Sequence, residues 1–189
     1  MEVLTKAEVL LRKKELVGKV KLGVVFIHPT DTIYGLGSSA FLFPSVQKIR
    51  DLKDRPTNPF SVWAPSVEWI KQNCVMTPKA EKWLAKLPGP YTLLLKLKQK
   101  KTIATNVAPG RDVIGVRIPK HWFSDIVREA GIPIVTTSAN KAGQPFMTTL
   151  ESLDPEVQKG VDFIIYEGPK EGHPSTIVDV EREELKERS

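Results

Sequence analysis

Short apolar runs alternate with amphipathic stretches along this chain. The apolar runs are rich in β-branched residues and show no polar alternation, which is typical of strands buried on both faces of a sheet. They span about 23–27, 61–63, 91–95, 113–118, 134–136, 163–166 and 176–178. Between them, apolar residues recur at helical spacing over about 45–52, 67–72, 79–87, 123–130 and 153–158. Interleaved strands and helices predict a layered α/β domain with a mixed sheet.

The two ends of the chain carry different signals. Thr5 and Glu8 have the spacing of a capping box, which predicts a helix that runs to about Leu16 and is ended by Gly18. The last stretch, 181–189, is nearly all charged, which predicts a solvated helix or disorder. No linker is long enough to divide the chain, so we expect residues 1–189 to form a single domain.

Composition narrows the class of protein. With 41% hydrophobic and 26% charged residues, the chain is typical of a soluble globular protein and not of a disordered, fibrous or membrane protein. A net charge of +6 gives a mild bias toward anions such as nucleotides or RNA. Cys74 is the only cysteine, which excludes an intramolecular disulfide. No apolar run approaches the ~20 residues of a membrane span and the N-terminus lacks a secretory signal, so we expect a cytoplasmic protein without a membrane partner.

Polar and small residues gather where the predicted strands end, which is where open α/β sheets place their ligands. The first such segment, 28–37, offers the hydroxyls of Thr32 and Tyr34 beside two glycines. The alternative reading is an ordinary strand-to-helix turn. A second segment, 174–179, offers hydroxyls at the start of a strand and is uninformative alone.

Two cations follow the helix expected to end near Leu52. In an extended stretch Lys53 and Arg55 would point to the same side, where they could hold a triphosphate or neutralise charge developing at phosphorus. The alternative reading is a solvated basic loop. Pro56 and Pro59 favour the first reading, because they make the loop rigid.

A third segment follows the strand at 134–136. Ser138 and Asn140 offer a hydroxyl and an amide on one side of a continued strand, with no general base beside them, which favours binding over nucleophilic attack. The alternative is that they cap the next helix. Arg117, at the end of another strand, could meet a carboxylate or could be a surface charge on an edge strand.

Common nucleotide and metal motifs are missing from the sequence. It has neither a Walker loop nor a dinucleotide fingerprint, so a nucleotide site would have to be built otherwise. The three histidines are dispersed and have no two-cysteine partner, so we expect no metal held by protein side chains alone.

Six motifs occur in a specific order: P-T-D-T-x-Y-G-L at 29–36, K-x-R-P with N-P at 53–59, P-G-P-x-T at 88–92, V-R-x-P at 116–119, S-A-N at 138–140 and P-S-T-I-V-D at 174–179. Together they resemble the YrdC family of threonylcarbamoyl-AMP synthases, over about Val20 to Val180. The resemblance implies a twisted mixed parallel and antiparallel sheet with flanking helices around a basic concave cavity. It also implies a nucleotidyltransferase that converts L-threonine, bicarbonate and ATP to threonylcarbamoyl-AMP and pyrophosphate, for tRNA threonylcarbamoyladenosine modification.

The resemblance carries roles onto particular residues. Its catalytic pair falls on Lys53 and Arg55. The positions that it implies for ATP are Lys53, Arg55, Asn58, Ser138 and Asn140, and those for threonine are Thr32, Tyr34, Arg117, Thr136 and Ser175. It implies Mg²⁺ bound with ATP, and as partners tRNA and a downstream threonylcarbamoyl transferase complex.

The resemblance leaves three questions open. Many family members carry a histidine near the place of Trp63, so the side chain that contacts substrate there is undecided. One alternative is a YciO-like protein of the same fold that binds RNA without making the adenylate. Another is the YrdC-like domain of hydrogenase maturation, which usually belongs to a far larger chain, whereas this sequence resembles the short, single-domain form.

Overall fold

One ten-stranded sheet runs through the computed structural model, which describes residues 1–187. The strands lie in the order β1-β8-β2-β3-β7-β4-β6-β5-β9-β10. Their bounds are β1 (Glu2–Leu4), β2 (Phe26–His28), β3 (Gly35–Ser39), β4 (Ser61–Trp63), β5 (Tyr91–Lys96), β6 (Val113–Arg117), β7 (Ile134–Ser138), β8 (Phe163–Ile165), β9 (Thr176–Asp179) and β10 (Glu184–Lys186).

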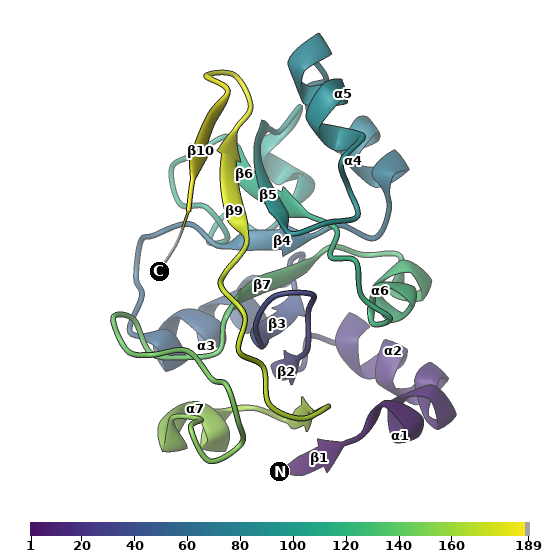
Figure 1. Ribbon diagram of the computed structural model, residues 1–189, viewed down its shortest axis with the longest axis vertical. Helices are drawn as coiled ribbons and strands as arrows, with labels where there is room; N and C mark the ends of the chain where they lie inside the picture. The colour runs from purple at the N-terminus through teal and green to yellow at the C-terminus, as the bar shows by residue number, and fades with distance from the viewer. Residues whose placement is uncertain (188–189) are drawn as a thin grey trace.

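The helices are short and lie between the strands in sequence. They are α1 (Lys6–Leu11), α2 (Lys13–Lys21), α3 (Phe43–Lys53), α4 (Val67–Asn73), α5 (Pro78–Leu84), α6 (Ser124–Ala130) and α7 (Pro155–Gly160), with a 3₁₀ turn at Lys100–Thr102. In Figure 1 they flank the sheet, with α4 and α5 beside the β5 end and α1, α2 and α7 nearer β2 and β8. No helix among residues 1–187 is long and apolar enough to cross a membrane.

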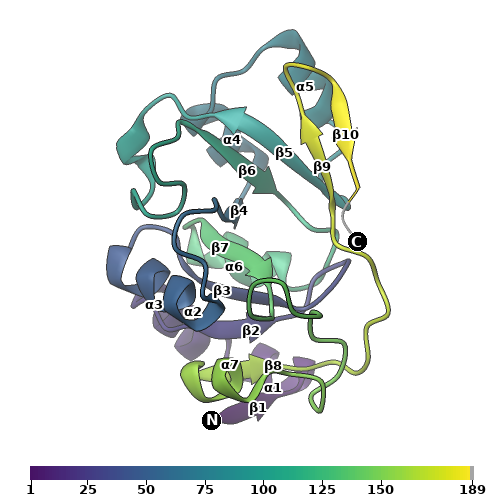
Figure 2. The same ribbon diagram turned by 90° about the vertical axis from the view of Figure 1, so that its left-hand side faces the viewer.

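The sheet mixes the two pairing directions, as predicted. β8 is parallel to β1 and β2, β4 is parallel to β6, and β5 is parallel to β9. The pairs β2–β3, β3–β7, β4–β7, β5–β6 and β9–β10 are antiparallel. In Figure 2, β5 and β6 run at a steep angle to β2 and β3, so the sheet is strongly twisted. The predicted fold class is therefore confirmed.

Neighbouring residues of a strand alternate between two apolar clusters. In β2, Phe26 belongs to the cluster beneath α2 and α6, and Ile27 to the larger cluster on the other face. Val62 and Trp63 in β4 divide in the same way. This alternation follows from the opposite directions of successive side chains in a strand. Both faces are buried, which is why the sequence shows continuous apolar runs, and each large side chain contributes roughly 1.5–3 kcal/mol by leaving water.

The predicted N-terminal helix is wrong in its extent. The capping box is present, with the Thr5 amide donating to Glu8 Oε2 at 2.7 Å, but the chain breaks at Arg12 into α1 and α2. Arg12 binds the carboxylates of Glu2 and Glu15. Gly18 lies inside α2 and does not end it. Packing of the apolar face of α2 against α6 outweighs the glycine penalty of about 1 kcal/mol.

Three strands were not predicted from the pattern. β1 and β10 are three residues long, and β10 forms where a solvated helix or disorder was expected. Residues 188–189 of that expectation lie outside the described part of the chain. The sequence of β3 is typical of a turn because it contains Gly35 and Gly37. In the structure, a Cβ on either glycine would lie within 2.9 Å of the ring of His28. The glycines let this ring pack flat on the strand.

Candidate functional site

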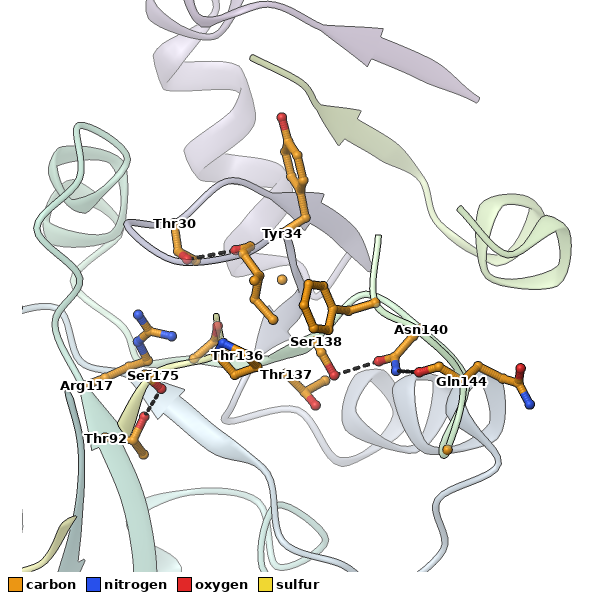
Figure 3. A pocket seen from close by; sticks show the side chains of 15 residues that line it. Thr30, Tyr34, Thr92, Arg117, Thr136, Thr137, Ser138, Asn140, Gln144 and Ser175 are labelled. Atoms are coloured by element: carbon orange, nitrogen blue, oxygen red, sulfur yellow. Dashed lines mark hydrogen bonds between the residues drawn. The ribbon is translucent and has the colours of Figure 1, made fainter. Parts of the chain in front are cut away.

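A cavity of about 310 Å³ opens where β3, β5, β6, β7 and the segment before β9 meet (Figure 3). Six of the predicted site residues line it, and they come from stretches up to 141 positions apart along the chain (175 − 34). These six are Tyr34, Arg117, Thr136, Ser138, Asn140 and Ser175. The other lining residues are Thr30, Ile33, Gly35, Thr92, Thr137, Gly143, Gln144, Phe146 and Pro174.

Strand register brings these residues together. β3 begins where β7 ends, because the two strands are antiparallel and Gly35 faces Ser138. β5 is parallel to β9, with Tyr91 opposite Thr176 and Thr92 opposite Ile177, and Ser175 directly precedes β9 close to the hydroxyl of Thr92. The two hydroxyls are 2.6 Å apart and both side chains are buried. Polar side chains from β5, β6 and β7 and from the segment before β9 therefore face one small space, as a site for a small polar ligand requires.

Arg117 forms a buried ion pair at the edge of this cavity. Its Nη2 lies 2.6 Å from Oδ1 of Asp31 and 3.4 Å from the hydroxyl of Thr32. The Arg117 side chain is only 6% exposed and that of Asp31 only 11%. The reading of Arg117 as a surface charge on an edge strand is therefore wrong. Thr32 lies next to Arg117, although it is not one of the lining residues.

Tyr34 points its hydroxyl away from Thr136 and Ser138 (Figure 3). The hydroxyl donates to the Gly168 carbonyl at 2.6 Å and accepts from the Glu167 amide at 3.0 Å. Burial, partly offset by this amide, raises the pKa of Tyr34 to about 12. Tyr34 is one of the lining residues, its ring stacks on Tyr166, and its hydroxyl anchors the segment between β8 and β9.

Lys53 is buried, and the extended geometry expected for it is wrong. It is the last residue of α3, and Asp54 ends the helix in the left-handed conformation with φ 49°. Its Nζ donates to the carbonyls of Ser138 and Asn140, each at 2.6 Å, and to Asn140 Oδ1 at 3.0 Å. Burial, and secondarily the charge of Arg55, lowers the pKa of Lys53 to about 7. The solvated-loop reading fails for this residue, because three oxygens surround the ammonium and match its three donors.

Arg55 and Asn58 lie in the loop after α3 and not among the lining residues. The Arg55 guanidinium donates to the Pro59 carbonyl at 3.1 Å, and burial lowers its pKa. Asn58 is exposed, and its carbonyl accepts from Arg50 at 3.1 Å. The structure thus brings Lys53 to the Ser138–Asn140 turn and leaves Arg55 and Asn58 in the loop after α3, outside the cavity lining.

Arg50 holds this loop, a role that sequence reasoning missed. Its guanidinium donates to four main-chain carbonyls, at Asn106 (2.7 Å), Arg55 (2.7 Å), Asn58 (3.1 Å) and Val107 (3.2 Å). Its side chain also lies over the ring of Phe60, with 4.5 Å to the centroid. Burial lowers the pKa of Arg50. No sequence signal distinguishes this arginine from the other charges of its helix.

Ser138 and Asn140 shape the loop that follows β7. The Ser138 hydroxyl donates to Asn140 Oδ1 at 2.6 Å, and Asn140 Nδ2 donates to the Gln144 carbonyl (Figure 3). The helix-capping reading is wrong, because the next helix, α7, begins at Pro155 and is capped by Asp154. The pair instead forms a closed network with Lys53 on one wall of the cavity.

Several site residues escaped the sequence analysis. Thr92 lies in the P-G-P-x-T motif and Asp31 in the P-T-D-T-x-Y-G-L motif. Neither motif indicates which residue each side chain contacts. Gln144 and Phe146 follow the S-A-N motif in an irregular loop and carry no signal of their own. Trp63 is fully buried beside Phe123, with ring centroids 5.6 Å apart, so it packs in the core and is not one of the lining residues.

The fold and this hydroxyl-lined cavity define an α/β protein with a small polar pocket at the ends of its strands. The chain belongs to the Sua5/YciO/YrdC family, whose model, described as "Telomere recombination", matches residues 19–187. The resemblance to the YrdC family is thereby confirmed. The basic character of the cavity stays a prediction, because among its lining residues Arg117 alone is cationic, and Asp31 pairs with it.

Curated relatives span most of this chain. A protein of Methanocaldococcus jannaschii is 37% identical over 177 residues, covering 92% of this chain and 80% of that one. A Bacillus subtilis protein named "Threonylcarbamoyl-AMP synthase" is 31% identical over 170 residues, covering 88% of this chain and 46% of its own length. The present chain therefore spans about half of some relatives.

Solved structures share the fold. Pyrococcus abyssi Sua5 complexed with L-threonine superimposes with a TM-score of 0.80 at 28% identity, covering 94% of this chain and 53% of that one. E. coli YciO superimposes with a TM-score of 0.80 at 22% identity, covering 94% of this chain and 88% of that one, which supports the fold alone.

Proposed function

We propose that this protein is an L-threonylcarbamoyladenylate synthase, a nucleotidyltransferase that makes threonylcarbamoyl-AMP and pyrophosphate from L-threonine, bicarbonate and ATP. The observation that carries the proposal is the meeting of Arg117, Thr136, Ser138, Asn140 and Ser175 in one cavity. The threonine complex of a relative with the same fold supports it. So does the activity named for the relatives.

The amino-acid end of the cavity is formed around Arg117. Its guanidinium would bind the threonine carboxylate, because a planar fork of N–H donors matches two carboxylate oxygens. Thr32 is 3.4 Å from that guanidinium, and the hydroxyls of Thr136 and Ser175 line the same space. Tyr34 would contribute its ring, since its hydroxyl binds Gly168.

The nucleotide end lies at the Ser138–Asn140 turn. Lys53 places its charge beneath this turn, within 3.0 Å of three of its oxygens, and Arg55 and Asn58 follow in the adjoining loop. In this proposal Arg55 leaves the Pro59 carbonyl and binds phosphate. Because no cluster of three or more His, Cys, Asp or Glu side chains occurs among residues 1–187, Mg²⁺ would arrive with ATP and be held by phosphate oxygens.

Formation of the adenylate needs positive charge near the reacting phosphate. The amine of threonine captures the carbon of bicarbonate as a carbamate, with loss of water, and a carbamate oxygen then bonds to the α-phosphorus while the bond to pyrophosphate breaks. One anion approaches another, so repulsion is the main obstacle. Lys53 and Arg55 would offset it, and losing one preorganised donor of this kind typically costs about 3–4 kcal/mol in the barrier. Holding carbamate and nucleotide side by side supplies much of the remainder.

Pyrophosphate release tests the proposal directly. We expect turnover of ATP to pyrophosphate that requires both L-threonine and bicarbonate. Pyrophosphate release that ignores threonine would contradict the assignment. In the cell the product would pass to a threonylcarbamoyl transferase that acts on tRNA.

RNA binding of the YciO kind is the second candidate, and the net charge of +6 favours it. The same protein would then bind structured RNA with an affinity that falls steeply with salt. It would also give no heat in calorimetry when ATP and L-threonine are added.

A further inference from the structure

Asp31 occupies both of its carboxylate oxygens at the edge of the cavity. Oδ1 accepts from Arg117 Nη2 at 2.6 Å, and Oδ2 accepts from the main-chain amide of Lys120 at 2.9 Å. Asp31 lies in the turn between β2 and β3, whereas Lys120 lies beyond the end of β6. The carboxylate of Asp31 therefore binds the main chain at Lys120, 89 residues further along, and also the side chain of Arg117, which lines the cavity.

Burial makes this pair strongly directional. A guanidinium removed from water is costly unless a carboxylate balances it, and removing one partner of such a pair leaves an uncompensated buried charge. The five N–H donors of a guanidinium lie in one plane, so binding an oxygen at one edge fixes the direction of the whole group. Because the amide of Lys120 holds the second oxygen, the carboxylate itself cannot rotate without losing a hydrogen bond.

We propose that Asp31 is a positioning residue for substrate recognition: it fixes the guanidinium of Arg117 so that the cavity selects amino acids with a free α-carboxylate. This inference rests on the proposed function, because it assumes that L-threonine binds at Arg117. It adds a specificity device that acts through Arg117 and not by touching the substrate. A fork of five donors is large enough to bind the carboxylate of Asp31 and that of a substrate together.

The test compares two ligands that differ only in the carboxylate. L-Threonine and L-threoninamide are titrated by calorimetry into the wild type, Asp31→Ala and Asp31→Asn, each first checked for folding by circular dichroism. We expect the wild type to prefer threonine by at least about tenfold, and Asp31→Ala to lose most of that preference. Asp31→Asn keeps the volume but replaces one acceptor oxygen with a donor, so its preference should fall between the two.

Asp162 offers a matched control. Its carboxylate also accepts from a main-chain amide, that of Val25 at 2.8 Å, and pairs with a cation, Lys48 at 3.4 Å, but outside the cavity lining. Asp162→Asn should keep the wild-type preference. If the role of Asp31 were purely structural, its substitution would weaken the binding of L-threonine and L-threoninamide equally. The ratio of the two affinities would then stay at the wild-type value, and this result would overturn the inference. Failure of the wild type to bind L-threonine would overturn the proposed function together with it.

Discussion

The Nζ of Lys53 lies 2.6 Å from the main-chain carbonyl of Ser138, a contact that joins the last residue of α3 to the last residue of β7. The same ammonium binds Asn140 twice, through its carbonyl and its side-chain oxygen. Lys53 is 1% exposed, so this contact is made out of water. A lysine that a linear motif suggests as a phosphate ligand therefore also determines the shape of the turn that lines the cavity.

Replacing Lys53 with methionine should lower pyrophosphate turnover by at least about tenfold. The substitution keeps the length of the side chain but removes the charge and leaves the carbonyls of Ser138 and Asn140 without their donor. Steady-state pyrophosphate release measures the effect. Lys159→Met, on an exposed lysine of α7, is the control and should turn over at the wild-type rate. A near-normal rate in Lys53→Met would remove this residue from the site.

Ser138→Ala should also lower turnover by at least about tenfold, while the protein stays folded. The hydroxyl donates to Asn140 Oδ1 at 2.6 Å, and its loss leaves Lys53 Nζ as the remaining donor to that oxygen in the cavity wall. Ser66→Ala is the matched control, because Ser66 caps α4 away from the cavity. That variant should lose about 1 kcal/mol of stability and no activity. Equal turnover in Ser138→Ala and Ser66→Ala would show that the Ser138 hydroxyl has no part in the reaction.

Acid should destabilise the protein through His28. This ring is fully buried, stacked on Phe123 with centroids 5.6 Å apart, and burial lowers the pKa of His28 to about 3. The unfolded chain binds a proton near pH 6.5 and the folded chain does not, so the free energy of unfolding falls as the pH drops from about 6.5 toward 3. The slope should approach about 1.4 kcal/mol per pH unit.

Urea unfolding at several values between pH 6.5 and 4 would measure this slope. In His28→Leu the unfolding free energy should depend less on pH over the same range, because the titrating group is gone. His173→Gln changes an exposed histidine and serves as the control. An identical pH dependence in the wild type and His28→Leu would rule out His28 as the source.

Arg50→Lys should weaken ATP binding more than threonine binding. A lysine has three donors on one atom and cannot reach the four carbonyls that the guanidinium joins, so the loop carrying Arg55 and Asn58 should loosen. We expect stability to fall by about 1–3 kcal/mol, as for other unsatisfied buried groups. Calorimetry with ATP and with L-threonine measures the two affinities. Arg128→Lys is the control, because Arg128 forms an exposed ion pair with Asp125 on α6. Equal weakening of both ligands would contradict a specific effect on the loop.

The sequence predicted the elements better than their ends. Continuous apolar runs identified the strands that cross the core, because both faces of the sheet are buried there. β3 was not predicted, because Gly35 and Gly37 stand where a strand usually has bulky residues. Glycine is needed at both positions because the ring of His28, from the neighbouring strand β2, occupies the space of their side chains. The predicted range of α3 ends before Lys53, because local spacing does not reveal that the helix continues until Asp54 adopts a left-handed conformation.

The site could be predicted only as a set of motifs. Six of the residues carried over by resemblance line one cavity, whereas composition and spacing alone left a structural alternative open for Tyr34, Arg117, Ser138 and Asn140. The partners were out of reach, because Asp31 meets Arg117 across 86 residues and Lys53 meets Ser138 across 85. Such pairs depend on strand order and register, which a periodic pattern does not encode.

The four acceptors of Arg50 belong to the main chain, and this affects how the neighbouring sequence can change. A loop held by its carbonyl groups keeps its path whatever side chains project from it. Pro56 and Thr57 are exposed and contribute no atom to that grip. A change of side chain at Thr57 would therefore leave these hydrogen bonds and the path of the loop intact, whereas Pro56 also stiffens the loop through its fixed φ.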